Sequence, residues 1–353
     1  MFRTRRPHGT RRPHGWRLAL ALAPVVALAA ACGSGAATDA GPGKELVLKV
    51  ADPGNSGPLA VAKRDGTFDK ALAPLGAKVE WVTTTPGFSS MLKLFNTRQL
   101  DVSGAAFSPV VGALSKDVAV RIAAVQDPAG KDQSGIIATK ASGIHSVADL
   151  VGKRVAVNPA GKGEYILLKA LAQAGVPAAK VTRVPLQQKD AASAFATGKV
   201  DAWASFLVPY QEAKANGGVE IATEQSIGSK DNTVVVFRTE ILDKRPEVVA
   251  KYLEVLQGLT VRQHDDPAAF ENVFERSGPT ALTGARLADA LRVDAEATVP
   301  RLPRDSDAAD LADVVNLFAD NGVISRRITA ADIFYDLKAK LTPDQLAAVR
   351  KGQ

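Results

Sequence analysis

The fold is decided by the stretch from Lys153 to Val208, which reads KRVAVNPAGKGEYILLKALAQAGVPAAKVTRVPLQQKDAASAFATGKVDAWASFLV. Short apolar runs alternate in it with segments of helical periodicity, in the order 154–157 (apolar), 164–174 (helical), 180–186 (apolar), 190–197 (helical) and 200–207 (apolar). This alternation is typical of strands joined by crossover helices. The stretch therefore predicts a parallel βαβαβ unit.

The first turn of this unit, NPAGKG at 158–163, is the first candidate site. Ligands of open parallel sheets bind beyond the carboxyl ends of the strands. Gly161 and Gly163 permit a close approach of the backbone, and the amides that open the next helix point toward such a ligand. Lys162 would add a positive charge there or would simply be solvated. A tight glycine turn without a ligand is the alternative interpretation.

A second copy of part of this unit lies 100 residues earlier. The sequence LFNTRQLD at 94–101, with Pro109 beyond it, matches AFATGKVD at 194–201, with Pro209 beyond it. Phe, Thr, Asp and Pro recur in register. The match predicts the same helix–strand unit in each of two similar lobes, with coincidence in Ala-rich sequence as the alternative.

The beginning of the chain is typical of a secretory signal. Six arginines and no acids precede Leu18, and an apolar segment then runs to Ala31, too short and too Ala-rich for a comfortable membrane span. Cys32 directly follows LAAA and resembles the bacterial lipobox, in which the thiol is lipidated. Ala29 stands where that motif usually has Leu, so plain secretion stays open. The Gly-, Ala- and Ser-rich segment 33–43 reads as a flexible tether.

Composition excludes several classes of function. Six of the 44 basic residues precede Cys32, which leaves 38 basic against 37 acidic residues and a formal charge of +1 for the rest of the chain. No basic field for nucleic acid remains. Cys32 is the only cysteine, and only His145 and His264 follow it. The chain therefore has too few Cys and His residues to favour a disulfide framework, a metal centre or a Ser-His-Asp triad. No cofactor is expected.

The length indicates two lobes, because about 320 residues follow Cys32 and exceed one ordinary core. Two apolar runs flank the 153–208 unit, at 134–139 and 232–237, and are candidates for the two crossings between lobes. We therefore assign 1–31 to the signal, 32–43 to the tether, 44–133 with 238–353 to the first lobe, and 134–237 to the second. Amphipathic helices beyond Pro246 are expected to brace the first lobe.

Three turns of the first lobe carry candidate ligand groups. Asn55 and Ser56 precede a helix. Their side chains either cap this helix or bind a ligand. Phe88 lies beside two serines in the turn TTPGFSS at 84–90, as a core staple or as one wall of a pocket. The Phe107–Ser108 pair opens the third helix.

Several segments together resemble the substrate-binding proteins of bacterial ABC importers. They are PLAVAK at 58–63, VEWV at 79–82, DLVGKRVAV at 149–157 and GKVDAW at 198–203. The branch that is most similar binds aliphatic sulfonates, taurine and nitrate, and also pyrimidine precursors of thiamine. The similarity runs from about Lys44 to Val261.

The resemblance implies a type II periplasmic-binding-protein-like α/β fold, with two lobes joined by two β crossovers that close on a small ligand by a hinge motion. It implies a monomeric binding protein rather than an enzyme, at the outer face of the bacterial membrane, held there by a lipid anchor only and served by an ABC permease and its ATPase. Helix N-termini that converge on the cleft would hold an anion. The candidate ligand residues are Asn55, Ser56, Phe88, Ser89, Ser90, Phe107, Ser108, Ser134, Ala160, Gly161, Lys162, Gly163 and Phe206.

One departure leaves the ligand class open. Many members of the family continue with Trp-Asp-Pro or Trp-Glu-Pro, whereas this chain reads ASFLVPY at 204–210. Phe206 stands in for the Trp, but no acid precedes Pro209. A thiamine-pyrimidine precursor or another aromatic solute is therefore the alternative to a sulfonate-like anion. A further alternative is an enzyme of pyrimidine synthesis with the same fold, but such an enzyme would need reactive His and Cys residues. A binding protein that presents its ligand to a sensor kinase instead of a permease would have the same sequence pattern.

Overall fold

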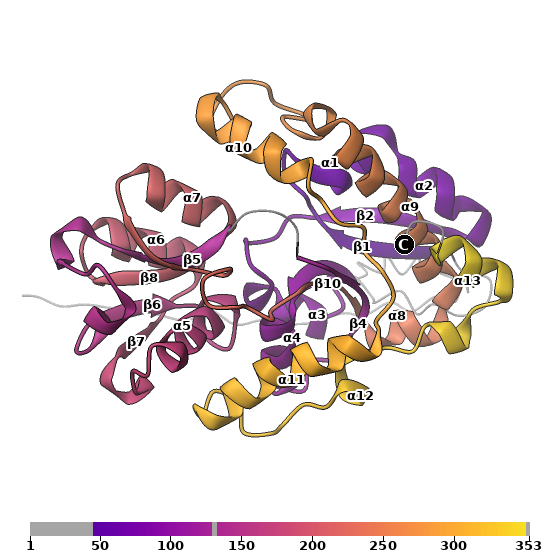
Figure 1. The fold of residues 1–353 in the computed structure, drawn as a ribbon. Coiled ribbons are helices and arrows are strands. Elements are labelled where there is room, and N and C mark those ends of the chain that lie inside the picture. Colours follow the sequence, from indigo (N-terminus) through magenta and orange to yellow (C-terminus); the bar gives the residue numbers. More distant parts are fainter. Residues whose placement is uncertain (1–44, 129–132, 351–353) are drawn as a thin grey trace, which may run out of the picture. The chain divides into compact units, whose positions relative to one another are not determined.

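The computed structural model describes residues 45–128 and 133–350, which form two five-stranded mixed sheets (Figure 1). The first sheet has the order β2-β1-β3-β10-β4, with β1 parallel to β2 and β3, and β10 antiparallel to β3 and β4. Its strands are β1 (Leu46–Ala51), β2 (Ala77–Val82), β3 (Val102–Ala106), β4 (Val120–Gln126) and β10 (Thr233–Arg238).

The second sheet has the order β7-β6-β8-β5-β9 and contains the predicted parallel unit. Strand β6 pairs in parallel with both β7 and β8, while β5 is antiparallel to β8 and β9. Its strands are β5 (Ser134–Ala138), β6 (Arg154–Val157), β7 (Thr182–Pro185), β8 (Ala202–Phe206) and β9 (Val219–Thr223). The expectation of two α/β lobes is confirmed.

The crossings between the sheets differ from the expected ones. The chain passes to the second sheet between β4 and β5, and returns between β9 and β10. The apolar runs at 134–139 and 232–237 are therefore interior strands, and β10 belongs to the first sheet although a boundary at residue 237 assigns it to the second lobe. The physical reason is burial on both faces of these runs, which suits a strand with neighbours on either side.

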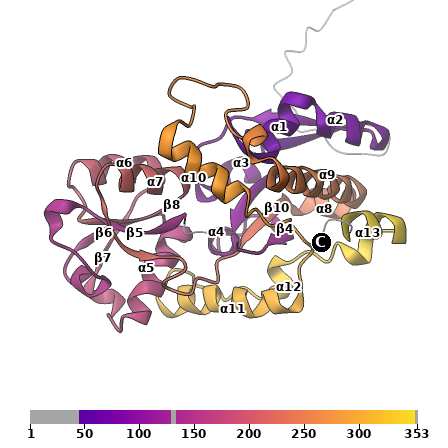
Figure 2. The ribbon, with the colours of Figure 1, turned by 45° about the horizontal axis from the view of Figure 1, so that its top comes forward.

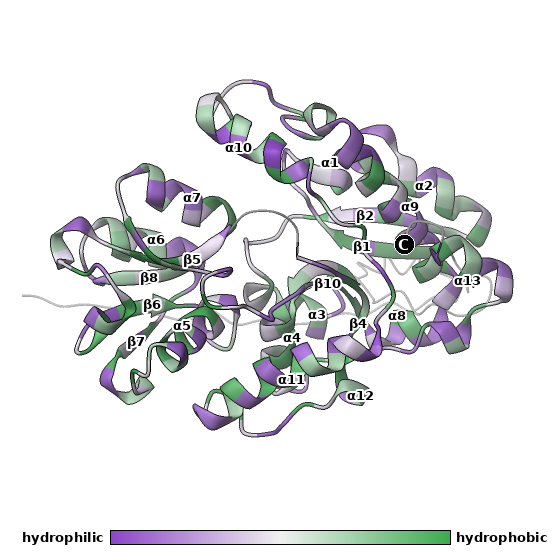
Figure 3. Cartoon of the chain, viewed as in Figure 1, coloured by the Kyte–Doolittle hydropathy of each residue, from purple (hydrophilic) through white to green (hydrophobic). Residues whose placement is uncertain are grey.

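Helices cover both sheets, whose strands are largely hydrophobic in Figure 3. In the first lobe these are α1 (Gly57–Asp65), α2 (Thr67–Leu72), the 3₁₀ turn η2 (Phe88–Ser90), α3 (Leu92–Asn96), α4 (Phe107–Leu114), α8 (Thr239–Lys244) and α9 (Pro246–Asp265). In the second they are α5 (Lys162–Gln173), α6 (Gln188–Ala196) and α7 (Leu207–Ala215). The later ones are α10 (Gly284–Asp294), α11 (Asp305–Asp320), α12 (Ala330–Ile333) and α13 (Pro343–Arg350).

The C-terminal helices brace more than the first lobe. Helix α9 packs on α1 and α2, as Figure 2 shows, and Tyr252 on α9 stacks on Phe68 with ring centroids 4.4 Å apart. Helix α11, in contrast, lies against α4 of the first lobe and α5 of the second. Asp313 on α11 accepts hydrogen bonds from Tyr165 (2.9 Å) and Lys169 (2.6 Å). Helix α11 therefore connects the two lobes.

Three expectations from the sequence lie outside the described residues. The signal, Cys32 and the tether precede residue 45, where the description begins. Within 45–128 and 133–350, the longest helices are too polar or too short to cross a bilayer.

Candidate functional site

The candidate site is built from turns at the carboxyl ends of parallel strands in both sheets. In the first lobe these turns follow β1, β2 and β3, and in the second they follow β6 and β8. Parallel strands bring their carboxyl ends to one edge, which is where α/β sheets bind ligands.

The turns of the two lobes lie directly against each other. A Cβ atom on Gly161 would lie 2.9 Å from Ser89 Oγ, and one on Gly87 would lie 4.0 Å from the Phe206 ring. A Cβ atom on Gly112 of α4 would lie 2.2 Å from the carbonyl oxygen of Ala160. The structure therefore brings Ser89, Phe206 and the 160–161 turn together.

Within the 84–90 turn, the three candidate residues have different environments. Phe88 is buried against Phe95, with ring centroids 5.4 Å apart, which is the environment expected for a core staple. The Ser90 hydroxyl donates to the Gly87 carbonyl at 2.6 Å and closes the turn. Ser89 Oγ, in contrast, is buried and has no hydrogen-bond partner among the described residues. Ser89 is thus the side chain of this turn with unused hydrogen-bonding capacity.

The Asn55 side chain fixes a neighbouring loop. It donates to the Glu275 carbonyl at 2.7 Å and accepts from the amides of Phe274 (2.8 Å) and Glu275 (2.9 Å). Ser56 is the N-cap residue of α1 but its side chain makes no capping hydrogen bond. The first turn of α1 contains no acid, so its positive end is not compensated locally.

The N-terminus of α4 is occupied by a carboxylate of the chain. Asp231 accepts hydrogen bonds from the Ser108 amide (2.7 Å) and the Ser108 hydroxyl (2.6 Å), and all three groups are buried. Burial raises the pKa of Asp231, although Lys162 and Ser108 act in the opposite direction. Phe107 is buried with its ring edge against Phe334. The positive end of the α4 dipole is therefore compensated by Asp231, a carboxylate of the chain itself.

Lys162 is paired rather than free. Its ammonium lies 2.7 Å from Glu224 and 3.8 Å from Asp231, and only 15% of its side chain is exposed. Burial alone would lower the pKa of Lys162, but the two carboxylates outweigh burial and raise it. Burial likewise opposes ionisation of Glu224, but Lys162 and the hydroxyls of Ser134 and Ser229 lower its pKa. Lys162, Glu224 and Asp231 form an ion cluster that we call the Lys162 cluster.

The amides that open α5 are also used by the chain itself. Asn158 Oδ1 accepts from the Gly163 amide at 2.7 Å, and Glu164 accepts from the Ala160 amide at 2.7 Å. A Cβ atom on Gly163 would lie 2.4 Å from the Ala204 carbonyl oxygen, so glycine is required there by packing. Gly161 and Gly163 therefore serve close packing, whatever else they do.

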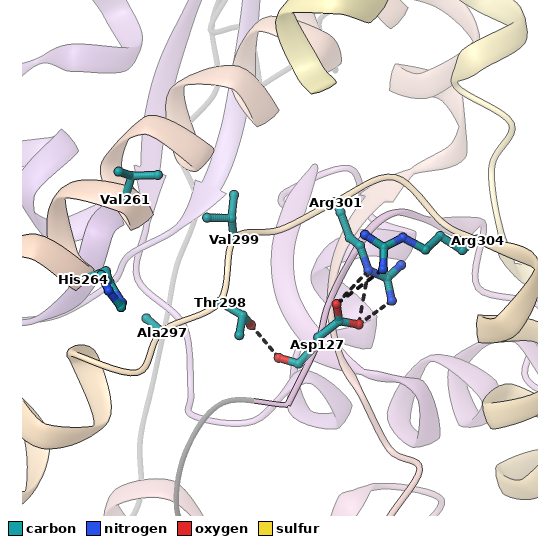
Figure 4. A pocket seen from close by; sticks show the side chains of 8 residues that line it. All are labelled: Asp127, Val261, His264, Ala297, Thr298, Val299, Arg301 and Arg304. Atoms are coloured by element: carbon teal, nitrogen blue, oxygen red, sulfur yellow. Dashed lines mark hydrogen bonds and ion pairs between the residues drawn. The ribbon is translucent and has the colours of Figure 1, made fainter. Parts of the chain in front are cut away.

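Sequence reasoning missed Glu224 and Asp231, and it missed a hollow beside β4. Figure 4 shows this hollow, of about 410 Å³, lined by Asp127, Val261, His264, Ala297, Thr298, Val299, Arg301 and Arg304. Arg301 is buried and bonds both Asp127 and Asp307, and its hydrogen bonds lower the pKa of Asp127. No motif marks these residues, because their pairing joins segments about 170 residues apart.

Two α/β lobes with mixed sheets, whose turns meet beyond the carboxyl ends of the parallel strands, have the architecture of a bilobal binding protein. A family model described as "NMT1/THI5 like" matches residues 54–268, and the chain belongs to that family. A Bacillus subtilis (strain 168) protein named for binding aliphatic sulfonates is 32% identical over 243 residues, which are 67% of this chain and 72% of that protein. The taurine-binding periplasmic protein of Escherichia coli (strain K12) is 27% identical over 207 residues, 58% of this chain and 62% of that protein.

Solved structures have the same fold. The alkanesulfonate-binding protein SsuA from Xanthomonas axonopodis pv. citri, bound to MOPS, superposes with a TM-score of 0.73 at 20% identity, over 83% of this chain and 99% of that one. SsuA from Escherichia coli gives 0.63 at 21% identity, over 82% and 92%. The desulfurization enzyme DszB also shares the fold, with a TM-score of 0.57 at 15% identity, over 86% and 98%.

These relationships make the chain a solute-binding protein and not an enzyme. The relatives found by sequence are named for binding, and the enzyme shares only the fold. Within residues 45–128 and 133–350, no three His, Cys, Asp or Glu side chains gather in a way that would hold a metal ion.

Proposed function

We propose that the chain is the extracytoplasmic solute-binding component of an ABC importer, and that it captures a small, anionic, sulfonate-like organic solute between its lobes. The observation that carries the proposal is the meeting of the Ser89 and Gly161 turns, where the Ser89 hydroxyl is buried and has no hydrogen-bond partner in the described part of the chain. An unpaired buried hydroxyl costs free energy unless a ligand or water satisfies it.

The groups most able to hold the anion are those that the chain itself does not already pair. The starts of α4 and α5 and the Lys162 ammonium are already paired within the chain. The start of α1 at Ser56, which follows β1, has no capping side chain and no acid in its first turn. The Ser89 hydroxyl, which follows the adjacent strand β2, has no partner among the described residues. We propose that these two groups of the first lobe bind the anionic head, through helix-start amides and one hydroxyl donor.

A ligand screen tests the function. Thermal shift with alkanesulfonates, taurine, nitrate, small carboxylates and pyrimidines should show stabilisation by sulfonates, because a ligand at 100 times its Kd stabilises the folded state by about 2.7 kcal/mol. No response to any member of the panel, or a neutral pyrimidine bound more tightly than every anion, would reject the anionic assignment.

A charge placed at Ser89 tests the site. Ser89→Asp should weaken sulfonate binding at least tenfold, since losing a hydrogen bond to a charged group costs about 1.5–3 kcal/mol and repulsion adds to this cost. Ser193→Asp adds the same charge on the exposed side of α6 and should bind normally in titration calorimetry. Equal affinities for the two variants would place the anion elsewhere.

We further propose that Cys32 is lipidated and that a permease and its ATPase receive the solute from a monomeric protein. Cys32→Ala should release the protein from the membrane fraction without changing affinity, because every residue proposed here to bind the solute comes later in the chain. A Cys32→Ala protein that stays in the membrane fraction would reject the anchor.

A further inference from the structure

The internal repeat permits a residue-by-residue comparison of the two lobes. An offset of 100 relates β3 (Val102–Ala106) to β8 (Ala202–Phe206). Helices α4 and α7 then begin at the equivalent residues Phe107 and Leu207. The second helical residues, Ser108 and Val208, are equivalent too.

In the first lobe the chain itself covers both positions. Phe107 is fully buried, and its ring lies edge-on to Phe334 with centroids 5.8 Å apart. Ser108 is fully buried beneath Asp231. No space remains for a ligand at this helix start.

In the second lobe the equivalent side chains are open. Leu207 is 55% exposed and Val208 is 52% exposed, the two highest values among the large apolar side chains of the described residues. Phe206 lies directly before them, at 4.0 Å from a Cβ placed on Gly87 of the first lobe. Leu207 and Val208 directly follow β8, so they lie at the carboxyl edge of the second sheet, next in the chain to the residue that meets the first lobe.

The backbone at Leu207 is also strained. Its φ is +57°, in the left-handed region that bulky L residues rarely adopt. The other non-glycine residues with positive φ in the described segments are Arg98, Asp117, Ala160 and Asn272, none of them a large apolar residue.

Folding does not explain a strained and exposed leucine. Helix α7 is anchored by Tyr210, which is fully buried, and the Leu207 amide donates to the Gln133 carbonyl at 2.7 Å whatever the side chain is. Glycine or asparagine would hold the same backbone at lower cost. Strained backbone clusters at active sites and ligand clamps, and contiguous exposed apolar surface marks sites of interaction.

We propose that Leu207 and Val208 form the surface that binds the hydrocarbon part of the ligand, and that these two side chains set the preference for its chain length. This inference rests on the proposed solute-binding site and names the residues that contact the apolar part of the solute. Burial of each methylene on this surface raises affinity about fourfold.

Titration calorimetry with n-alkanesulfonates from one to eight carbons tests the proposal. The wild type should gain affinity with each methylene that is buried. Leu207→Asn and Val208→Thr should reduce this gain to about twofold or less per methylene, with methanesulfonate affinity unchanged within twofold. Val151→Thr is the matched control, because Val151 is 49% exposed at the opposite end of β6 and should leave the gain unchanged.

Different outcomes would reject the assignment of Leu207 and Val208 and the assignment of a sulfonate ligand. A chain-length gain that is the same in both variants as in the wild type overturns the inference, as does an equal loss for methanesulfonate and octanesulfonate. If no sulfonate binds, the sulfonate assignment fails, and n-alkyl carboxylates and n-alkylamines of the same lengths provide the same measurement. A gain that depends on Leu207 in either series supports the inference, and the lack of any gain in all three series overturns it. Leu207→Gly should fold with an equal or higher Tm, since it relieves the strain.

Discussion

Asp101 and Asp201 make the same pair of backbone hydrogen bonds in the two lobes. The Asp101 carboxylate accepts from the Lys49 amide at 3.0 Å while its own amide donates to the Lys49 carbonyl at 2.8 Å. The Asp201 carboxylate accepts from the Arg154 amide at 2.8 Å while its amide donates to the Arg154 carbonyl at 2.8 Å. Each aspartate thus links the strand that it precedes to the neighbouring parallel strand, which explains why Asp recurs at an offset of 100.

The two aspartates should differ in their contribution to stability. Asp101 is buried and also bonds Arg238, which is nearly buried. Asp101→Ala leaves Arg238 with Glu240 as its remaining partner and removes a buried charge-assisted hydrogen bond, so it should cost about 1.5–3 kcal/mol. Asp201 pairs with the more exposed Arg154, so Asp201→Ala should cost about 1 kcal/mol. Urea unfolding measures both, and equal losses would contradict the assignment.

Removing the ammonium of the Lys162 cluster should destabilise the protein strongly. Lys162→Met leaves Glu224 and Asp231 as buried carboxylates without a cation, at a cost of about 3–5 kcal/mol in urea unfolding. Lys230→Met is the control, because the ammonium of Lys230 is half exposed and pairs with Asp310 at 3.3 Å, a contact worth about 1 kcal/mol at most. Adding Glu224→Gln to Lys162→Met should recover part of the loss. Equal effects of Lys162→Met and Lys230→Met would show that the cluster is not a buried ion cluster.

Glu271 should make stability depend on pH above its ordinary pKa. Burial and the neighbouring Asp294 raise the pKa of Glu271 to about 8 from an ordinary value of 4.5. The folded state therefore binds a proton that the unfolded state has lost, and this contribution to stability is complete below pH 4.5 and disappears as pH rises through 8. Glu271→Gln should flatten the fall in Tm between pH 5 and 8.5, whereas Asp289→Asn, an exposed change on α10, should leave it unchanged. A wild-type Tm that rises over this interval in parallel with that of Glu271→Gln would contradict the assignment.

Gly112 should be required by the contact between lobes. In Gly112→Ala the new methyl group would lie 2.2 Å from the Ala160 carbonyl oxygen, so the lobes must separate locally, at a cost of about 1–3 kcal/mol. Gly258→Ala is the matched control in the exposed interior of α9, where the methyl meets no atom within 4 Å and should stabilise by about 1 kcal/mol. The same sign of change in both variants would reject a close contact at Gly112.

Local patterns in the sequence predicted most of the elements. The apolar run at 154–157 is strand β6 with the same bounds, and the repeat at 94–101 and 194–201 appears as α3–β3 and α6–β8. These signals are local, since they depend on periodicity and on turn residues. The same signals did not show that the run at 232–237 pairs within the first sheet, because strand partners are chosen by tertiary packing.

The candidate site was less predictable for the same reason. Asn55, Ser108 and Lys162 have their partners at Glu275, Asp231 and Glu224, and no local pattern shows such pairings. Gly161 was chosen for its freedom to approach a ligand, but a Cβ there would lie 1.9 Å from Asn158 Nδ2, so a substitution would disturb the turn itself. Ser89 and Phe206, in contrast, lie where the two lobes meet, as expected from the sequence.

The position of β10 has a consequence for synthesis on the ribosome. Strand β4 pairs with β10 alone among the described strands, and β10 is made after the whole second sheet. A nascent chain that ends at residue 224 contains β5 to β9 complete, whereas the first sheet still lacks the strand that joins β4 to β3. Limited proteolysis of that truncated chain should protect 134–223 and cleave β4, and the reverse pattern would contradict this order. We therefore expect the later-made lobe to fold first. Strand β4 would until then remain an exposed hydrophobic segment that chaperones and proteases can reach.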